Sequence, residues 1–183
     1  MNETQGNVIL EYSLDRLSEG EFLINYDISK QEIPAEIERQ LSKALDERNS
    51  DNVELALMLG FKYEFSESVL SILHRLLECI WHSKHEDIIG LLQGFSSPLS
   101  VKPLCNAVEL KEQLDYLNYD DYGSYYKKCF WALNSIGNDE AIDTIRGFSN
   151  HQDPIISEQA KYRLSKLAIP KEKKSSFWRG LFK

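Results

Sequence analysis

The sequence predicts an all-α protein in which about four helix pairs stack into an α-α superhelix. Apolar residues recur at helical spacing in segment after segment, and the core positions of one segment recur at a fixed distance further along the chain. Only one short window alternates with a period of two residues, so a strand there would have no partner strand.

The composition is that of a folded protein with one main domain. Its 183 residues are enough for a hydrophobic core, and 42% hydrophobic with 27% charged residues is typical of globular proteins. The formal net charge of −8 disfavours nucleic acid as a ligand and favours a basic protein partner. The polar, acidic N-terminus and the lack of a long apolar stretch predict a cytoplasmic protein with no transmembrane segment.

The first predicted unit covers residues 1–33 and packs as an N-terminal segment on the helical body. Within it Phe22, Ile24, Tyr26 and Ile28 alternate along the chain, which predicts an extended conformation.

The helical repeat domain is predicted for residues 34–168. Pro34 suits a first helical turn, and Asp51 with Glu54 forms a possible capping box for the next helix. A longer helix is expected to begin at Ser66 and to keep Ile80 on its apolar face. The predicted helices lie in the segments 34–48, 51–59, 66–80, 88–95, 100–108, 129–136, 141–148 and 154–167.

An internal repeat supports the stacked helix pairs. A shift of 41 residues pairs Leu92 with Leu133, and a further shift of 31 residues pairs Leu133 with Leu164. The ten-residue difference between the two shifts corresponds to extra chain around residues 109–121. Helix pairs that recur every 30 to 45 residues or so indicate an α-solenoid, in which each pair buries its apolar face against its neighbours.

The segment from Trp131 to Ile145, which reads WALNSIGNDEAIDTI, is followed by Asp153-Pro154 and a further helical pattern. It resembles the short HEAT-like repeat, whose pattern is A-L-x-x-I-G-x-x-E-A-x-x-x-L, a D-P turn and a second helix. The resemblance is close over residues 125–168 and extends by helix periodicity over residues 52–168. It implies a HEAT-like solenoid.

Residues 169–183 form a basic tail. They contain five basic residues and one acidic residue, so the tail carries +4 and leaves −12 for the rest of the chain. The tail contains Phe177, Trp178, Leu181 and Phe182, which would share one face of a helix and could anchor it to an anionic membrane. We expect instead that it folds back on the last helices or stays unstructured, because one short basic helix is a weak anchor.

No catalytic or metal centre is predicted. Cys79, His82 and His85 form the one cluster of possible metal ligands, but on a continuous helix they would point in different directions. We expect the two histidines to lie at a helix end and the cysteines to be reduced residues of the core. Since no nucleophile, phosphate-loop or metalloprotease motif is present, we expect neither an enzyme nor a bound cofactor.

The segment 109–126 holds five tyrosines and five acidic residues against one lysine. Tyrosines beside carboxylates suit a surface that binds a basic protein, although tyrosines 122, 125 and 126 could equally fill the core. The predicted partner-binding residues are Glu112, Asp115, Tyr116, Tyr119, Asp120, Asp121 and Tyr122.

The predicted function is therefore a protein–protein interaction module. An acidic HEAT-like solenoid is similar to the immunity proteins that bacteria encode beside polymorphic or contact-dependent toxins, which implies a basic partner such as a toxin nuclease domain. Alternatives within HEAT-like families are an adaptor or assembly factor, a bilin lyase, or an alkylpurine DNA glycosylase, which would need a basic groove. The gene immediately upstream distinguishes them, because an immunity protein should follow a large secreted toxin.

Overall fold

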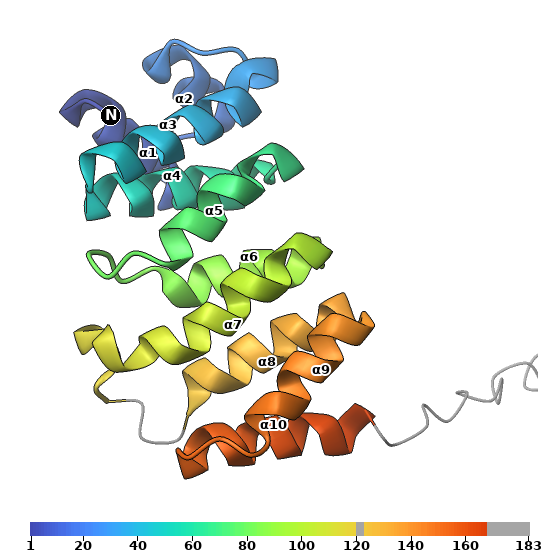
Figure 1. Ribbon diagram of the computed structural model, residues 1–183. Helices are drawn as coiled ribbons and strands as arrows, with labels where there is room; N and C mark the ends of the chain where they lie inside the picture. Colours follow the sequence, from blue (N-terminus) through green and yellow to red (C-terminus); the bar gives the residue numbers. More distant parts are fainter. Residues whose placement is uncertain (120–122, 168–183) are drawn as a thin grey trace, which may run out of the picture.

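The chain is all-α, as predicted. The computed structural model describes residues 1–119 and 123–167, and within these residues there are helices and no strands (Figure 1). The helices are α1 (Glu3–Ser13), α2 (Glu19–Tyr26), α3 (Ile33–Glu47), α4 (Ser50–Tyr63), α5 (Leu70–Leu77), α6 (His85–Phe95), α7 (Val101–Leu110), α8 (Ser124–Ile136), α9 (Asp139–Phe148) and α10 (Pro154–Leu167). None of those helices has the length and apolar character that a membrane crossing requires. The predicted basic tail lies outside the described residues.

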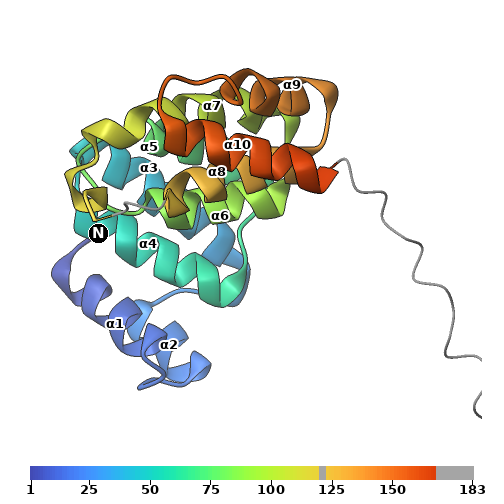
Figure 2. The same ribbon diagram turned by 90° about the horizontal axis from the view of Figure 1, so that it is seen from below.

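The helices after α2 form consecutive pairs that pack in two rows. Within the pairs, α3 packs on α4, α5 on α6, α7 on α8 and α9 on α10. Helices α3, α5, α7 and α9 also pack on one another in succession, and α6, α8 and α10 do the same (Figures 1 and 2). Each helix therefore buries an apolar face mainly against its neighbours in the stack.

The repeated core positions are buried as the shift predicts. Leu92 and Leu133 are fully buried, whereas Leu164 is half-buried because no further described helix covers α10. Gly137 ends α8 with φ +68°, a left-handed conformation that glycine adopts without strain.

The prediction of an extended N-terminal segment was wrong, because residues 3–13 and 19–26 are helical. Phe22 and Tyr26 lie one helical turn apart and are buried, whereas Ile24 is 78% exposed. Phe22 and Tyr26 are four residues apart, so their spacing fits one face of a helix as well as an alternation with a period of two. Ser18 and Glu21 close a capping box that starts α2, and α1 packs on α4 and on α2.

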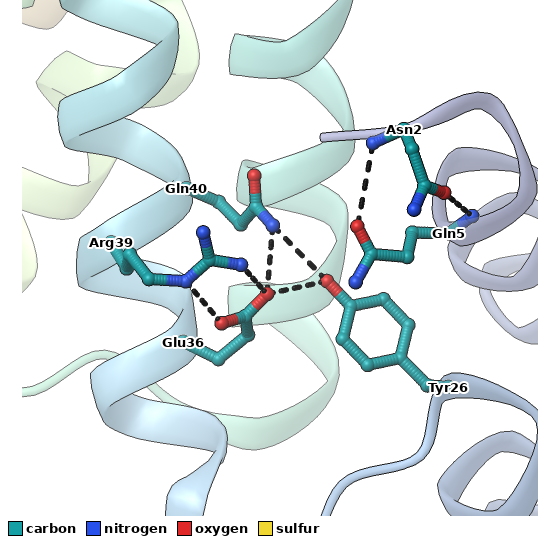
Figure 3. A network of polar contacts seen from close by, with 6 residues as sticks. All are labelled: Asn2, Gln5, Tyr26, Glu36, Arg39 and Gln40. Atoms are coloured by element: carbon teal, nitrogen blue, oxygen red, sulfur yellow. Dashed lines mark hydrogen bonds and ion pairs between the residues drawn. The ribbon is translucent and has the colours of Figure 1, made fainter.

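A polar network joins α2 to α3 (Figure 3). The Tyr26 hydroxyl donates a hydrogen bond of 2.6 Å to Oε1 of Glu36, and Gln40 donates one of 2.7 Å to the same oxygen. Arg39 binds both oxygens of Glu36 at 2.7 Å. Burial acts to raise the pKa of Glu36, but these hydrogen bonds outweigh it and hold the pKa below its usual value. The carboxylate therefore stays charged at the α2–α3 contact.

Two predicted helix boundaries also needed correction. Helix α4 begins at Ser50, because the Asn49 side chain caps it by accepting the Asn52 backbone N–H, so Asp51 and Glu54 do not form the cap. Helix α5 ends at Leu77, and Ile80 lies beyond it with 58% of its surface exposed.

Candidate functional site

The acidic, tyrosine-rich segment forms the connection between α7 and α8. It contains two short 3₁₀ helices, Lys111–Gln113 and Asp115–Leu117. Leu114 follows the first 3₁₀ helix and is 1% exposed. Leu117 is the last residue of the second and is 2% exposed. The two leucines therefore anchor this described part of the connection to the core, as expected from their apolar area.

The predicted binding residues divide between surface and interior. Glu112, Asp115 and Tyr119 are exposed, and Tyr119 reaches 73% exposure. Oε1 of Glu112 accepts a hydrogen bond of 3.3 Å from the Tyr126 hydroxyl, whereas Asp115 forms no ion pair with any described residue. Tyr116 is half-buried. The predicted residues Asp120, Asp121 and Tyr122 lie outside the described residues.

The two tyrosines at the start of α8 belong to the core. Tyr125 and Tyr126 are 0% and 1% exposed, and their rings meet edge to face with centroids 6.2 Å apart. Of the tyrosines in this segment, these two therefore serve packing, as the alternative interpretation of the sequence allowed.

Tyr116 connects this segment to the histidines that the sequence had singled out separately. Its hydroxyl lies 3.0 Å from Nδ1 of His85, and the two rings stack with centroids 5.7 Å apart. His85 in turn stacks on His82 at 4.3 Å. Tyr116, His85 and His82 thus form an aromatic stack, here called the histidine stack, between the α5–α6 and α7–α8 connections.

Hydrogen bonds occupy all the ring nitrogens of the histidine stack. Nε2 of His82 is 2.9 Å from the Leu76 carbonyl, and its Nδ1 accepts the Lys84 backbone N–H. Nε2 of His85 is 2.7 Å from the Cys79 carbonyl, so it carries the proton and Nδ1 accepts the Tyr116 hydroxyl. The rings are therefore held as neutral tautomers with no lone pair left for a metal.

The electrostatics of the histidine stack agree with neutral rings. Burial, followed by the neighbouring His82, lowers the pKa of His85 from 6.5 to about 4. Burial likewise lowers the pKa of His82. No group of three or more His, Cys, Asp and Glu side chains in residues 1–119 and 123–167 is arranged to hold a metal ion. The histidine stack therefore holds Tyr116, which lies within the α7–α8 connection, against His85 at the start of α6.

The start of α6 adds acidic residues that the sequence analysis did not assign to this surface. Burial is the main cause of the raised pKa of Tyr116, and the negative charges of Glu86 and Asp87 raise this pKa further. Glu86 forms an ion pair of 2.8 Å with Lys128, and Asp87 is exposed. Asp87 is distant in sequence from residues 109–126, and the contact between Tyr116 and His85 brings the start of α6 against them.

The three cysteines are free thiols, and their burial varies. Cys129 is buried, whereas Cys79 and Cys105 are half-buried. Burial raises the pKa of all three thiols, which keeps them protonated and poorly nucleophilic at neutral pH.

Comparison of the chain with protein-family models, with curated proteins and with solved structures finds no match.

Proposed function

We propose that this chain is a protein-binding module with a HEAT-like solenoid architecture that acts as an immunity protein. In this proposal it catalyses no reaction and neutralises a basic toxin domain by binding it. The binding surface consists of Asp87, Glu112, Asp115 and Tyr119, here called the acidic edge, together with Asp120, Asp121 and Tyr122.

The observation that supports this proposal best is the exposure of Tyr119 beside an anchored loop. Its side chain is 73% exposed two residues after Leu117, which is 2% exposed. A tyrosine offers a large contact area, and an anchored loop loses little conformational entropy when it is covered by a partner. Tyr119 therefore has the properties of an interface hot spot.

The charge of the acidic edge suits a basic partner. Asp87, Glu112 and Asp115 are all exposed, and among the described residues none of them forms an ion pair. A toxin nuclease domain binds phosphates with clustered cations, and carboxylates presented together can occupy the same cations. The two-row stack of helix pairs is compatible with the solenoid that the sequence resemblance implies.

The test uses the protein encoded immediately upstream of this chain. Co-expression should protect cells from the growth arrest that this protein causes, and the two purified proteins should form a complex. Tyr119→Ala should weaken the complex about thirtyfold, which corresponds to roughly 2 kcal/mol at a hot spot. Tyr162→Ala, which removes another exposed tyrosine on α10, serves as the matched control and should bind like the wild type.

The absence of a complex would contradict the proposed function. A complex that tolerates Tyr119→Ala as well as Tyr162→Ala would remove the acidic edge from the interface.

A further inference from the structure

The neighbouring helices α6 and α8 carry opposite charges on their solvent faces. Helix α6 contains Glu86 and Asp87 and no lysine or arginine, whereas α8 contains Lys127 and Lys128 and no acidic residue. Glu86 and Lys128 pair with each other across the two helices at 2.8 Å. Asp87 and Lys127 are exposed, and neither forms an ion pair with a described residue. One negative charge on α6 and one positive charge on α8 are therefore left without a partner in the described part of the chain.

The same two helix faces also differ in shape. On α6, Gly90 and Gly94 are exposed, and a methyl group added to either one would meet open space. On α8, Trp131 is 41% exposed. Nζ of Lys127 lies 5.4 Å and Cζ of Arg163 4.8 Å from the centroid of its ring. Helix α6 therefore presents a flat strip, whereas α8 presents a bulky indole that two cations hold in place.

The 41-residue repeat places these features at equivalent positions of the two helices. The shift that superimposes the buried leucines of α6 and α8 also pairs Gly90 with Trp131. It pairs the two carboxylates at the start of α6 with the two lysines of α8. Steps of three and four residues keep each set on one face of its helix. Because α6 and α8 pack side by side, both sets face solvent on the same side of the stack (Figures 1 and 2).

A second copy of the chain matches this surface better than an extended anionic ligand does. A membrane or a nucleic acid that contacts the cations of α8 would also meet the carboxylates of α6 beside them. A second copy is related to the first by a two-fold axis that runs along the boundary between α6 and α8. Helix α6 of each copy then lies over α8 of the other, so that Asp87 faces cations and Gly90 faces Trp131. The symmetry makes each of these favourable contacts twice.

We propose that Asp87, Gly90, Gly94, Lys127 and Trp131, here called the two-fold face, bind a second copy of the chain to form a symmetric dimer. Trp131 has the properties of a central contact, because an indole whose orientation is already fixed loses little conformational entropy on binding. The contribution of Asp87 and Lys127 makes the dimer sensitive to salt. Asp87 also belongs to the acidic edge, so the dimer competes with the proposed basic partner for this residue, but its formation does not depend on that partner.

The test measures self-association of the full chain by sedimentation velocity at about 1–100 μM, the range expected for a small interface. The wild type should dimerise within this range and dissociate more readily at high salt. Asp87→Lys and Lys127→Asp each place like charges opposite each other at two symmetry-related positions. Each variant should therefore raise the dissociation constant about tenfold or more. An equimolar mixture of the two variants should restore the dimer, because unlike charges face each other again.

Gly90→Gln tests the shape of the two-fold face. The new side chain meets open space in the single chain, so the melting temperature of a dilute sample should not fall, but it occupies the position of Trp131 of the second copy and should weaken the dimer. Gly147→Gln, at an exposed and equally open position of α9, is the matched control and should dimerise like the wild type.

Three results would each overturn the proposal. They are a wild type that stays monomeric at about 100 μM and low salt, a mixture of the two charge variants that associates no better than either variant alone, and equal dimerisation of the two glycine variants. None of these measurements uses the proposed basic partner, so their outcome is independent of the proposed function.

Discussion

Replacing His85 with glutamine should remove much of the acid sensitivity of the fold. The buried ring has a pKa lowered from 6.5 to about 4, so between these pH values the unfolded chain binds more protons than the folded chain. The contribution of His85 to stability is therefore complete above pH 6.5 and is lost as the pH falls toward 4. For this single group the loss between pH 7 and pH 5 amounts to about 2 kcal/mol.

The assay compares the free energy of unfolding in urea at pH 7 and pH 5. The difference between these two values should be about 2 kcal/mol smaller in His85→Gln than in the wild type. If His85→Gln and the wild type lose the same free energy between the two pH values, His85 is not held neutral by burial and the account of the histidine stack is wrong.

Three further predictions concern the packing of the helices. Leu133→Ala should lower the free energy of unfolding by about 2–5 kcal/mol, because the side chain is fully buried, and a loss below about 1 kcal/mol in urea melts would show that the repeat register is wrong. Gly60→Ala should destabilise the fold by about 1–3 kcal/mol, because the new methyl group overlaps the Phe65 ring. Gly94→Ala, where the methyl group meets open space, should stabilise the fold by about 0.5–1 kcal/mol. Similar shifts in the unfolding midpoints of the two variants would contradict this prediction. Tyr26→Phe should cost about 1–3 kcal/mol by removing a hydrogen bond to the Glu36 carboxylate, and an unchanged melting temperature would exclude that contribution.

Apolar spacing was sufficient to predict the helix pairs but not the N-terminal helices. Leu92 and Leu133 are buried at the positions that the 41-residue shift selects, because each helix must bury one continuous face. In the short segment around Phe22 and Tyr26, the same residues satisfy both a period of two and a spacing of four. The Ser18–Glu21 capping box was the signal that decides between them.

The histidine stack could not be predicted from spacing, because Tyr116 and His85 are 31 residues apart. The sequence marked both clusters as unusual, but only the packing of the α5–α6 and α7–α8 connections brings them together. The same packing places Asp87 near the tyrosine-rich segment. Long-range contacts of this kind depend on how helices stack and leave no local pattern in the chain.

The most direct test of the acidic edge is the rate of association with the protein encoded immediately upstream, measured by surface plasmon resonance at two salt concentrations. Glu112→Lys combined with Asp115→Lys should slow association about tenfold or more at low salt and weaken its dependence on salt. Glu64→Lys combined with Glu67→Lys changes the net charge equally at two exposed positions in the α4–α5 connection, and should associate nearly as fast as the wild type. Equal rates for the two double variants would show that the partner responds to net charge alone and would contradict the acidic edge as its binding surface.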